Sequence, residues 1–251
     1  MRTIFLSPHL DDTTLSCGGW IADLVQAGES VEIWCIMAGD PPSPAPDTPL
    51  IRELHARWEA GQSPVIARRQ EELDANQQLG TGQNVVFLRL PDCIYRTHQG
   101  EALYPDGDAI FGEPHPADPA HAYLQQQTLP ADALIVAPAG VGNHVDHQIV
   151  RDWARRVVPP ERLILYEDYP YAHASDQIDA LAQALNLVPN IKKVSPSAFQ
   201  AKFQAILCYA SQISTFWRSS DELRANLRAY MERMAGDGSL AERYWRDSTI
   251  A

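Results

Sequence analysis

The stretch TIFLSPHLDDTTLSCGG, residues 3–19, joins an apolar run to a group of side chains that can bind metal. Its first four residues, Thr3–Leu6, are apolar or β-branched and predict a buried β-strand. His9, Asp11 and Asp12 follow directly, where such a strand turns into a helix. In open α/β sheets the reactive groups gather outside the carboxyl ends of the strands. The stretch therefore predicts an α/β fold with its chemistry at the end of the first strand.

Strand-like and helix-like segments alternate along the rest of the chain. Apolar, β-branched runs bounded by turn residues predict buried strands, and the segments between them have helical periodicity. The expected strands after the first are Val31–Met37, Val85–Leu90, Ala133–Ala137 and Leu163–Tyr166, and the expected helices are Leu15–Ala27, Val65–Leu79, His147–Val157 and Gln177–Leu185. This alternation predicts a Rossmann-like, mainly parallel sheet flanked by helices. We expect residues 1–251 to form a single domain.

Three segments depart from the alternation. The proline-rich stretches Asp40–Pro49 and Tyr104–Pro119 predict long surface loops near the strand ends, where they could form a rim around a substrate. From Ser197 onward the apolar positions have helical spacing. We therefore expect a helical C-terminal portion that packs on the same domain.

The composition narrows the classes of partner. A formal net charge of −12 leaves no basic face, which argues against nucleic acid and anionic membranes and favours small molecules. No apolar run approaches the ~18 residues that a membrane helix needs. The N-terminus shows no signal-peptide pattern, so we expect a cytoplasmic protein. A homo-oligomer is compatible with the sequence. Four cysteines without C-x-x-C spacing predict small buried apolar groups and no disulfide framework.

A second polar motif, GVGNHVDH at residues 140–147, follows another predicted strand and opens a helix. His144 and His147 lie three residues apart and can point at one spot, while Asp146 can orient an imidazole. If the two strand ends are neighbours, His9, Asp12 and His147 can supply three ligands to one metal. Two nitrogens and one carboxylate leave a fourth position open, which is typical of catalytic zinc. Water held there loses a proton near neutral pH.

Four segments together resemble the zinc-dependent PIG-L or LmbE-like family of N-acetylglucosaminyl-phosphatidylinositol de-N-acetylases. They are HLDD at 9–12, CGG at 17–19, RRQEE at 68–72 and HVDH at 144–147. The resemblance covers most of the chain, although Leu10 stands where the family usually has proline and Thr13 where it usually has glutamate. It implies a hydrolase that removes an N-acyl group, in the first place acetyl, from an amino sugar or a sugar-like small molecule.

The resemblance also implies a role for each residue of the two motifs. His9, Asp12 and His147 become the ligands of one Zn2+ per chain, and Asp11 becomes the general base. The chemistry of the residues agrees, since one carboxylate can bind metal while its neighbour takes a proton from the attacking water. His144 would donate a hydrogen bond to the developing oxyanion. Asp146 would keep an imidazole oriented.

Three further side chains are candidate substrate contacts. Arg68 matches the family's Arg/Glu helix, but an arginine followed by two glutamates is also typical of a solvated, ion-paired helix face. Arg96 follows the third predicted strand and could bind a sugar hydroxyl, or form an ion pair within its loop. Asp168 follows the run Leu163–Tyr166 and so is expected at the same edge of the sheet.

Other interpretations of the first motif remain open. His9 and Asp12 could cap a helix and nothing more. Gly18 and Gly19 could form the phosphate turn of a nucleotide-binding Rossmann module, although G-x-G-x-x-G is absent after the first strand. A metal-dependent phosphoesterase could use the same ligands.

Overall fold

A seven-stranded sheet forms the centre of the computed structural model, which describes residues 2–58, 64–173 and 177–250. The strand order is β3-β2-β1-β6-β7-β9-β8. Five strands pair in parallel, namely β1 (Arg2–Ser7), β2 (Ser30–Cys35), β3 (Val85–Phe87), β6 (Leu134–Pro138) and β7 (Leu163–Tyr166). These are the five strands that the apolar runs predict, and the mainly parallel α/β fold is confirmed.

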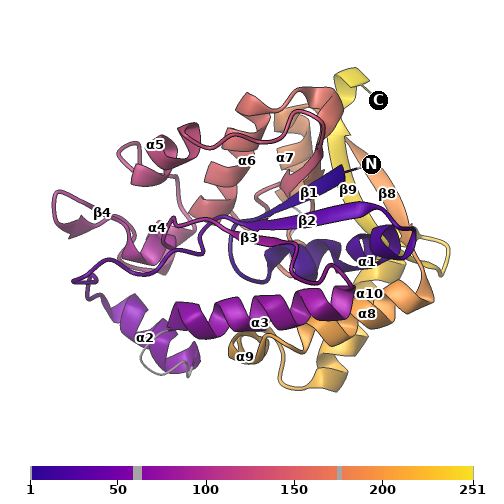
Figure 1. The fold of residues 1–251 in the computed structure, drawn as a ribbon, viewed down its shortest axis with the longest axis horizontal. Helices are drawn as coiled ribbons and strands as arrows, with labels where there is room; N and C mark the ends of the chain where they lie inside the picture. The colour runs from indigo at the N-terminus through magenta and orange to yellow at the C-terminus, as the bar shows by residue number, and fades with distance from the viewer. Residues whose placement is uncertain (1, 59–63, 174–176, 251) are drawn as a thin grey trace.

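Helices cover both faces of the sheet (Figure 1). One face carries α1 (Asp12–Gln26), α3 (Pro64–Leu79), α8 (Pro196–Ile206) and α10 (Ser220–Ala235), and the other carries α5 (Pro119–Gln125), α6 (Val145–Val157) and α7 (Gln177–Leu185). The fold also contains three short helices, α2 (Pro49–Trp58), α4 (Gly107–Ile110) and α9 (Ala210–Phe216), and a two-stranded ribbon of β4 (Thr97–His98) and β5 (Glu101–Ala102). There are four described 3₁₀ turns: η1 (Cys93–Tyr95), η2 (Pro160–Arg162), η3 (Tyr171–His173) and η4 (Ser248–Ile250). Figure 1 shows α2, α4 and β4 beyond the carboxyl ends of β1 and β2.

The register of the central strands brings two distant segments together. Thr3 on β1 pairs with Leu134 on β6, and Phe5 pairs with Val136. Both strands are buried and run in the same direction, so the chain that leaves β1 and the chain that leaves β6 emerge side by side. This pairing joins the first and second polar motifs at one edge of the sheet.

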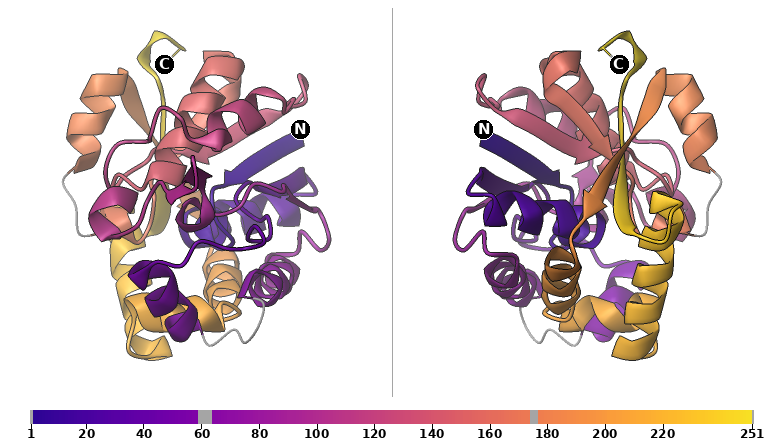
Figure 2. Two further views of the ribbon diagram at one scale, coloured as in Figure 1. Left: turned by 90° about the vertical axis from the view of Figure 1, so that its left-hand side faces the viewer. Right: turned by 90° about the vertical axis from the view of Figure 1, so that its right-hand side faces the viewer.

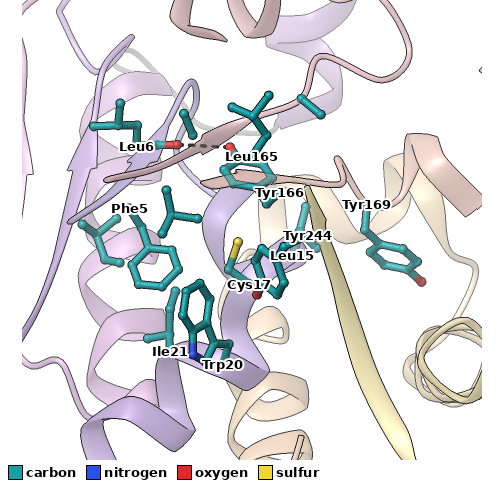
Figure 3. Packing of buried hydrophobic residues seen from close by; sticks show 14 of the residues in the cluster. Phe5, Leu6, Leu15, Cys17, Trp20, Ile21, Leu165, Tyr166, Tyr169 and Tyr244 are labelled. Atoms are coloured by element: carbon teal, nitrogen blue, oxygen red, sulfur yellow. Dashed lines mark hydrogen bonds between the residues drawn. The ribbon is translucent and has the colours of Figure 1, made fainter. Parts of the chain in front are cut away.

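A buried cluster between the sheet and α1 holds this arrangement (Figure 3). The rings of Phe5 and Trp20 meet edge to face, with centroids 5.4 Å apart. The Tyr166 hydroxyl donates a hydrogen bond of 3.1 Å to the carbonyl of Leu6, which ties β7 to the end of β1 (Figure 3). Cys17 lies within the cluster. All four cysteines are free, and three of them are buried.

The portion from Ser197 onward is helical in α8, α9 and α10 but also contains a strand, β9 (Leu240–Asp247). This strand and β8 (Leu187–Val194), which precedes the portion and was not predicted, extend the sheet as an antiparallel pair (Figure 2). Pro189, Lys192 and Lys193 on β8 are typical of an edge strand, where charge and proline block further pairing. Such a strand lacks the continuous apolar run of a central strand, and for this reason the sequence pattern missed it.

The two proline-rich segments are only partly loops. The stretch 38–48 is irregular and leads into α2, whereas the stretch 104–119 contains α4 and the start of α5. Among the described residues, no helix is long and apolar enough to cross a membrane.

Candidate metal centre

The turn after β1 is held in an unusual backbone conformation. Asp11, at the N-cap of α1, has φ 149° and ψ −29°, which residues with a side chain rarely adopt. The Ser7 hydroxyl donates to the His9 carbonyl (2.7 Å) and accepts from the Thr13 N–H (3.2 Å), and the His9 N–H donates to Asp12 Oδ2 (2.7 Å). The turn therefore directs the neighbouring carboxylates of Asp11 and Asp12 to different partners.

The Asp12 carboxylate lies between the rings of His9 and His147. Asp12 Oδ2 lies 3.4 Å from His9 Nδ1 and 3.3 Å from His147 Nε2. Ligands bound at ~2.0–2.2 Å to a tetrahedral zinc ion stand about 3.3–3.5 Å apart. His147 Nε2 is also buried, and its contact with Asp12 has the distance of an ion pair but not the geometry of a hydrogen bond. These residues fit a divalent metal, because a buried imidazole nitrogen without a hydrogen bond faces a carboxylate at the separation of two zinc ligands.

Each of the two histidines contacts a second carboxylate through its other ring nitrogen. His147 Nδ1 lies 2.7 Å from Asp168 Oδ1, and Asp168 Oδ2 accepts hydrogen bonds from the N–H groups of Gly140 and Val141. His9 Nε2 lies 3.0 Å from Asp146 Oδ2. Carboxylates in this position fix the tautomer and the ring orientation of a metal-binding histidine. The imidazole that Asp146 contacts is that of His9, so the predicted orienting role of Asp146 applies to His9.

The geometry revises the expected role of Asp168. Its side chain is about 1% exposed, lies behind His147 and does not line the pocket described below. Asp168 is therefore no substrate contact. It supports a candidate metal ligand through the ring nitrogen that faces away from the metal position.

The charges of the site favour a cation. Burial alone would lower the pKa of His147, but Asp12 and Asp168 outweigh it and raise this pKa to about 9. Burial likewise opposes a charged His9, whose pKa the surrounding carboxylates nevertheless raise well above 6.5. The pKa of Asp12 lies well below its usual value, because the two imidazoles outweigh the effect of burial. Carboxylates that stabilise imidazolium ions stabilise any cation in the same place.

Asp11 differs from its neighbour in both contacts and acidity. It lines the pocket and lies 3.9 Å from the Arg68 guanidinium. Burial, followed by the adjacent Asp12 charge, raises the pKa of Asp11 to about 8. A carboxylate whose pKa lies near the working pH is suited to accept and return a proton.

His144 presents a single nitrogen to the pocket. Its Nδ1 accepts the N–H of Asp146 at 3.2 Å as the N-cap of α6. Burial and the neighbouring His9 lower the pKa of His144 well below 6.5, so the ring is neutral and carries its proton on Nε2. The nitrogens of His9, His144 and His147 also lie within 4.8 Å of one another, which makes His144 the alternative to Asp12 as a third ligand.

A pocket of about 420 Å³ opens above these residues. Arg68 lines it, is only 7% exposed and places its guanidinium 4.9 Å from the centre of the Trp58 ring. Arg68 is therefore not on a solvated helix face. Phe111, Tyr171 and Phe216 form an aromatic wall of the pocket.

Arg96 lies outside this pocket. Its side chain is fully buried and forms ion pairs with Asp118 and Asp146. Both carboxylates belong to other elements, Asp118 at the N-cap of α5 and Asp146 on α6, so Arg96 makes neither the expected substrate contact nor an ion pair within its own loop.

Sequence reasoning missed Asp92 and the aromatic wall. Asp92 lines the pocket with Oδ2 3.8 Å from His9 Nε2, and its position after β3 is the same strand-end signal that marked His9. Tyr171 lies in η3, Phe216 lies in α9, and Phe111 directly follows α4. The positions of these short elements depend on the loops and carry no signal in the sequence.

Comparison with known proteins shows related deacetylases. The sequence profile of the PIG-L family, described as GlcNAc-PI de-N-acetylase, matches residues 4–158. Two 2'-N-acetylparomamine deacetylases are each 29% identical: the one from Niallia circulans over 67% of this chain and 66% of its own length, and the one from Streptomyces fradiae over 84% and 73%. The zinc-inhibited form of the teicoplanin deacetylase Orf2 superposes with a TM-score of 0.81 at 27% identity, over 99% of both chains.

Proposed function

Since this chain belongs to the PIG-L family, we propose that it is a zinc-dependent hydrolase that removes the N-acetyl group from an amino sugar or a sugar-like small molecule. The observation that carries the proposal is the convergence of His9, Asp12 and His147 beside a second carboxylate. The second carboxylate is that of Asp11, which lines the same pocket. Both deacetylase relatives from bacteria act on an N-acetylated sugar compound, according to their names.

The residues divide the chemistry among them. A divalent metal held by His9, Asp12 and His147 would supply Lewis-acid polarisation of the amide carbonyl. Asp11 takes a proton from the attacking water and returns it to the leaving nitrogen. His144 donates a hydrogen bond from Nε2–H to the oxygen on which negative charge develops. Arg68, beside Asp11, is positioned to contact the substrate.

The alternatives have less support. Gly18 and Gly19 lie inside α1, where an added Cβ would meet Lys202 at 2.9 Å and Val194 at 2.7 Å. They allow close packing and form no phosphate turn, which removes the basis of a nucleotide-binding module. The described lining of the pocket holds the carboxylates of Asp11, Asp12, Glu53 and Asp92 against the guanidinium groups of Arg57 and Arg68, and this balance of charge does not favour an anionic phosphate ester. The cytoplasmic location and a homo-oligomeric state stay predictions.

Released amine from a panel of N-acetylated amino sugars tests the function. We expect turnover by protein loaded with one equivalent of zinc, and none by the His147→Ala variant, which serves as the matched control. Zinc should be titrated, because the related Orf2 has a zinc-inhibited form. Hydrolysis of 4-nitrophenyl phosphate without amine release from any sugar would assign the site to the phosphoesterase instead.

A further inference from the structure

Arg96 is the centre of a buried network beneath the metal centre. Its Nε lies 3.0 Å from Asp118, and one terminal nitrogen donates to Asp146 Oδ1. The side chains of all three residues are 0% exposed. A third donor of the guanidinium, Nη1, reaches the Pro91 carbonyl at 3.2 Å. Burial of an unpaired arginine is very costly, so both carboxylates are needed to keep it in place.

The network continues from Asp146 to a candidate metal ligand. While Asp146 Oδ1 accepts from Arg96, its Oδ2 accepts the Cys93 N–H at 3.1 Å and lies 3.0 Å from His9 Nε2. A carboxylate whose two oxygens serve different fixed partners has one orientation. Arg96 thereby determines which oxygen faces His9 and where that oxygen lies.

In the other direction the network reaches the pocket. Asp118 caps α5 through the Ala120 N–H (2.8 Å) and accepts the Tyr104 hydroxyl proton (2.7 Å), and the same hydroxyl accepts the His115 N–H (2.9 Å). Asp118, which binds both Tyr104 and Arg96, thus links the two ends of the segment 104–118 to Arg96. It contributes Gly107, Ile110 and Phe111 to the pocket lining.

We infer that Arg96 is a positioning residue that acts through Asp146 to fix the His9 ring and that joins the pocket segment 104–118 to the metal centre. This inference rests on the proposed metal site. The planar fork of a guanidinium can bind two carboxylates at once, whereas a lysine ammonium acts as a point charge and cannot reproduce the fork. Outer partners of metal ligands typically change metal affinity by ~10–100-fold when they are altered.

A double-mutant cycle on zinc affinity tests the inference independently of turnover. Zinc dissociation constants are measured by chelator competition for wild type, Arg96→Lys, Asp146→Asn and the double variant. We expect Arg96→Lys to bind zinc about 10-fold more weakly. In the Asp146→Asn background the same change should have no further effect, because Arg96 acts through Asp146. Equal effects in both backgrounds would overturn the inference.

Two controls distinguish a positioning role of Arg96 from a general loss of protein stability and from a failure of the proposed function. Arg243→Lys alters another arginine that pairs with a buried carboxylate, that of Glu167. This ion pair contacts none of the three candidate ligands, so the variant should leave the zinc affinity unchanged. An equal loss there would contradict a specific role for Arg96. If wild type binds zinc no better than His147→Ala, the metal site itself fails. If the protein binds zinc but releases no amine, only the proposed reaction fails.

The unaltered chain provides a test if the Arg96 variants do not fold. Zinc that fixes His9 should slow amide hydrogen exchange in the segment 104–118 through Asp146 and Arg96. Exchange in α7, on the same face of the sheet but outside the network, is the internal reference. Protection of α7 and 104–118 to the same degree would contradict a specific connection.

Discussion

Asp11 and Asp12 are adjacent and chemically identical, yet the fold gives them opposite acidities. Asp12 lies between two imidazoles that lower its pKa, while Asp11 projects beside Arg68 into the pocket with a pKa raised to about 8. The difference originates in their neighbours, because burial and the Asp12 charge raise the pKa of Asp11, whereas His147 and His9 lower that of Asp12. One residue can therefore bind a metal while the other moves protons.

The pair can be separated by two conservative variants. Asp11→Asn should retain zinc and lower kcat by ~10²–10⁴, the usual contribution of a general base. Asp12→Asn should weaken zinc binding, because an amide oxygen is a poorer zinc ligand than a carboxylate. Metal content and kcat are measured together over a zinc titration. Rescue of Asp11→Asn by added zinc, with Asp12→Asn still inactive, would mean that the roles are reversed.

His144 is tested against its neighbour on α6. We expect His144→Ala to keep its zinc and to lose kcat, since its Nε2 proton is needed mainly in the transition state. His147→Ala should lose both. Elemental analysis distinguishes the two, and zinc-free His144→Ala protein would identify the three-histidine set as the ligands.

Zinc uptake should release protons at pH 7. A pKa of about 9 means that His147 carries a proton at this pH before zinc binds, and a ligand imidazole must be neutral. We expect the release of at least one proton for each zinc ion bound. Below pH 9, the apparent zinc affinity should then fall about tenfold for each unit by which the pH is lowered, for each proton released. Calorimetry in two buffers of different ionisation enthalpy measures the number. Binding without proton release would show that His147 is not a ligand.

The strands that the sequence patterns predict carry apolar, β-branched runs, including β2 and β3, which are only partly buried. β1, β6 and β7 are buried along their length, so their apolar runs are continuous. α6 has an evident apolar face, and the ligand motifs follow directly from β1 and β6. In contrast, β8 and β9 carry charged residues and pair at the edge of the sheet, and α2 and α4 depend on contacts across the pocket. Edge strands and pocket walls are set by tertiary contacts, which short sequence windows do not contain.

The pocket wall should affect substrate binding more than chemistry. Phe111 follows α4 and is 41% exposed, and its ring lies 5.5 Å from that of His144. Phe111→Ala should raise KM severalfold and leave zinc content and kcat nearly unchanged. Val157→Ala removes a comparably exposed apolar side chain at the end of α6 and is the control. A fall in kcat at constant KM would assign Phe111 to the reaction step.

At the scale of the whole molecule, the C-terminal strand supports the helix that begins with Asp12. Glu242 on β9 accepts hydrogen bonds from the Gly19 and Trp20 N–H groups of α1 and lies 2.7 Å from the Lys202 ammonium. Both side chains of this ion pair are nearly fully buried. One buried charge pair thus connects β9, α8 and α1.

Removal of one partner should be strongly destabilising. Lys202→Met leaves Glu242 buried without its cation, which should lower the free energy of unfolding by about 3 kcal/mol or more. Lys193→Met removes an exposed partner of Asp237 and should cost less than about 1 kcal/mol. Urea unfolding of the two zinc-free variants measures both values. Equal losses of unfolding free energy in the two variants would mean that the buried ion pair contributes no more to stability than the exposed one.

The pairing of β1 with β6 also has a consequence for the order of events during synthesis. Asp12 leaves the ribosome long before His147, and more than half of the chain lies between them. The nascent chain therefore cannot assemble the three ligands until β6 has been made and has docked beside β1. Metal can therefore bind at this site only after β1 and β6 have paired. Zinc then stabilises the folded chain by mass action, to a degree set by the free zinc concentration.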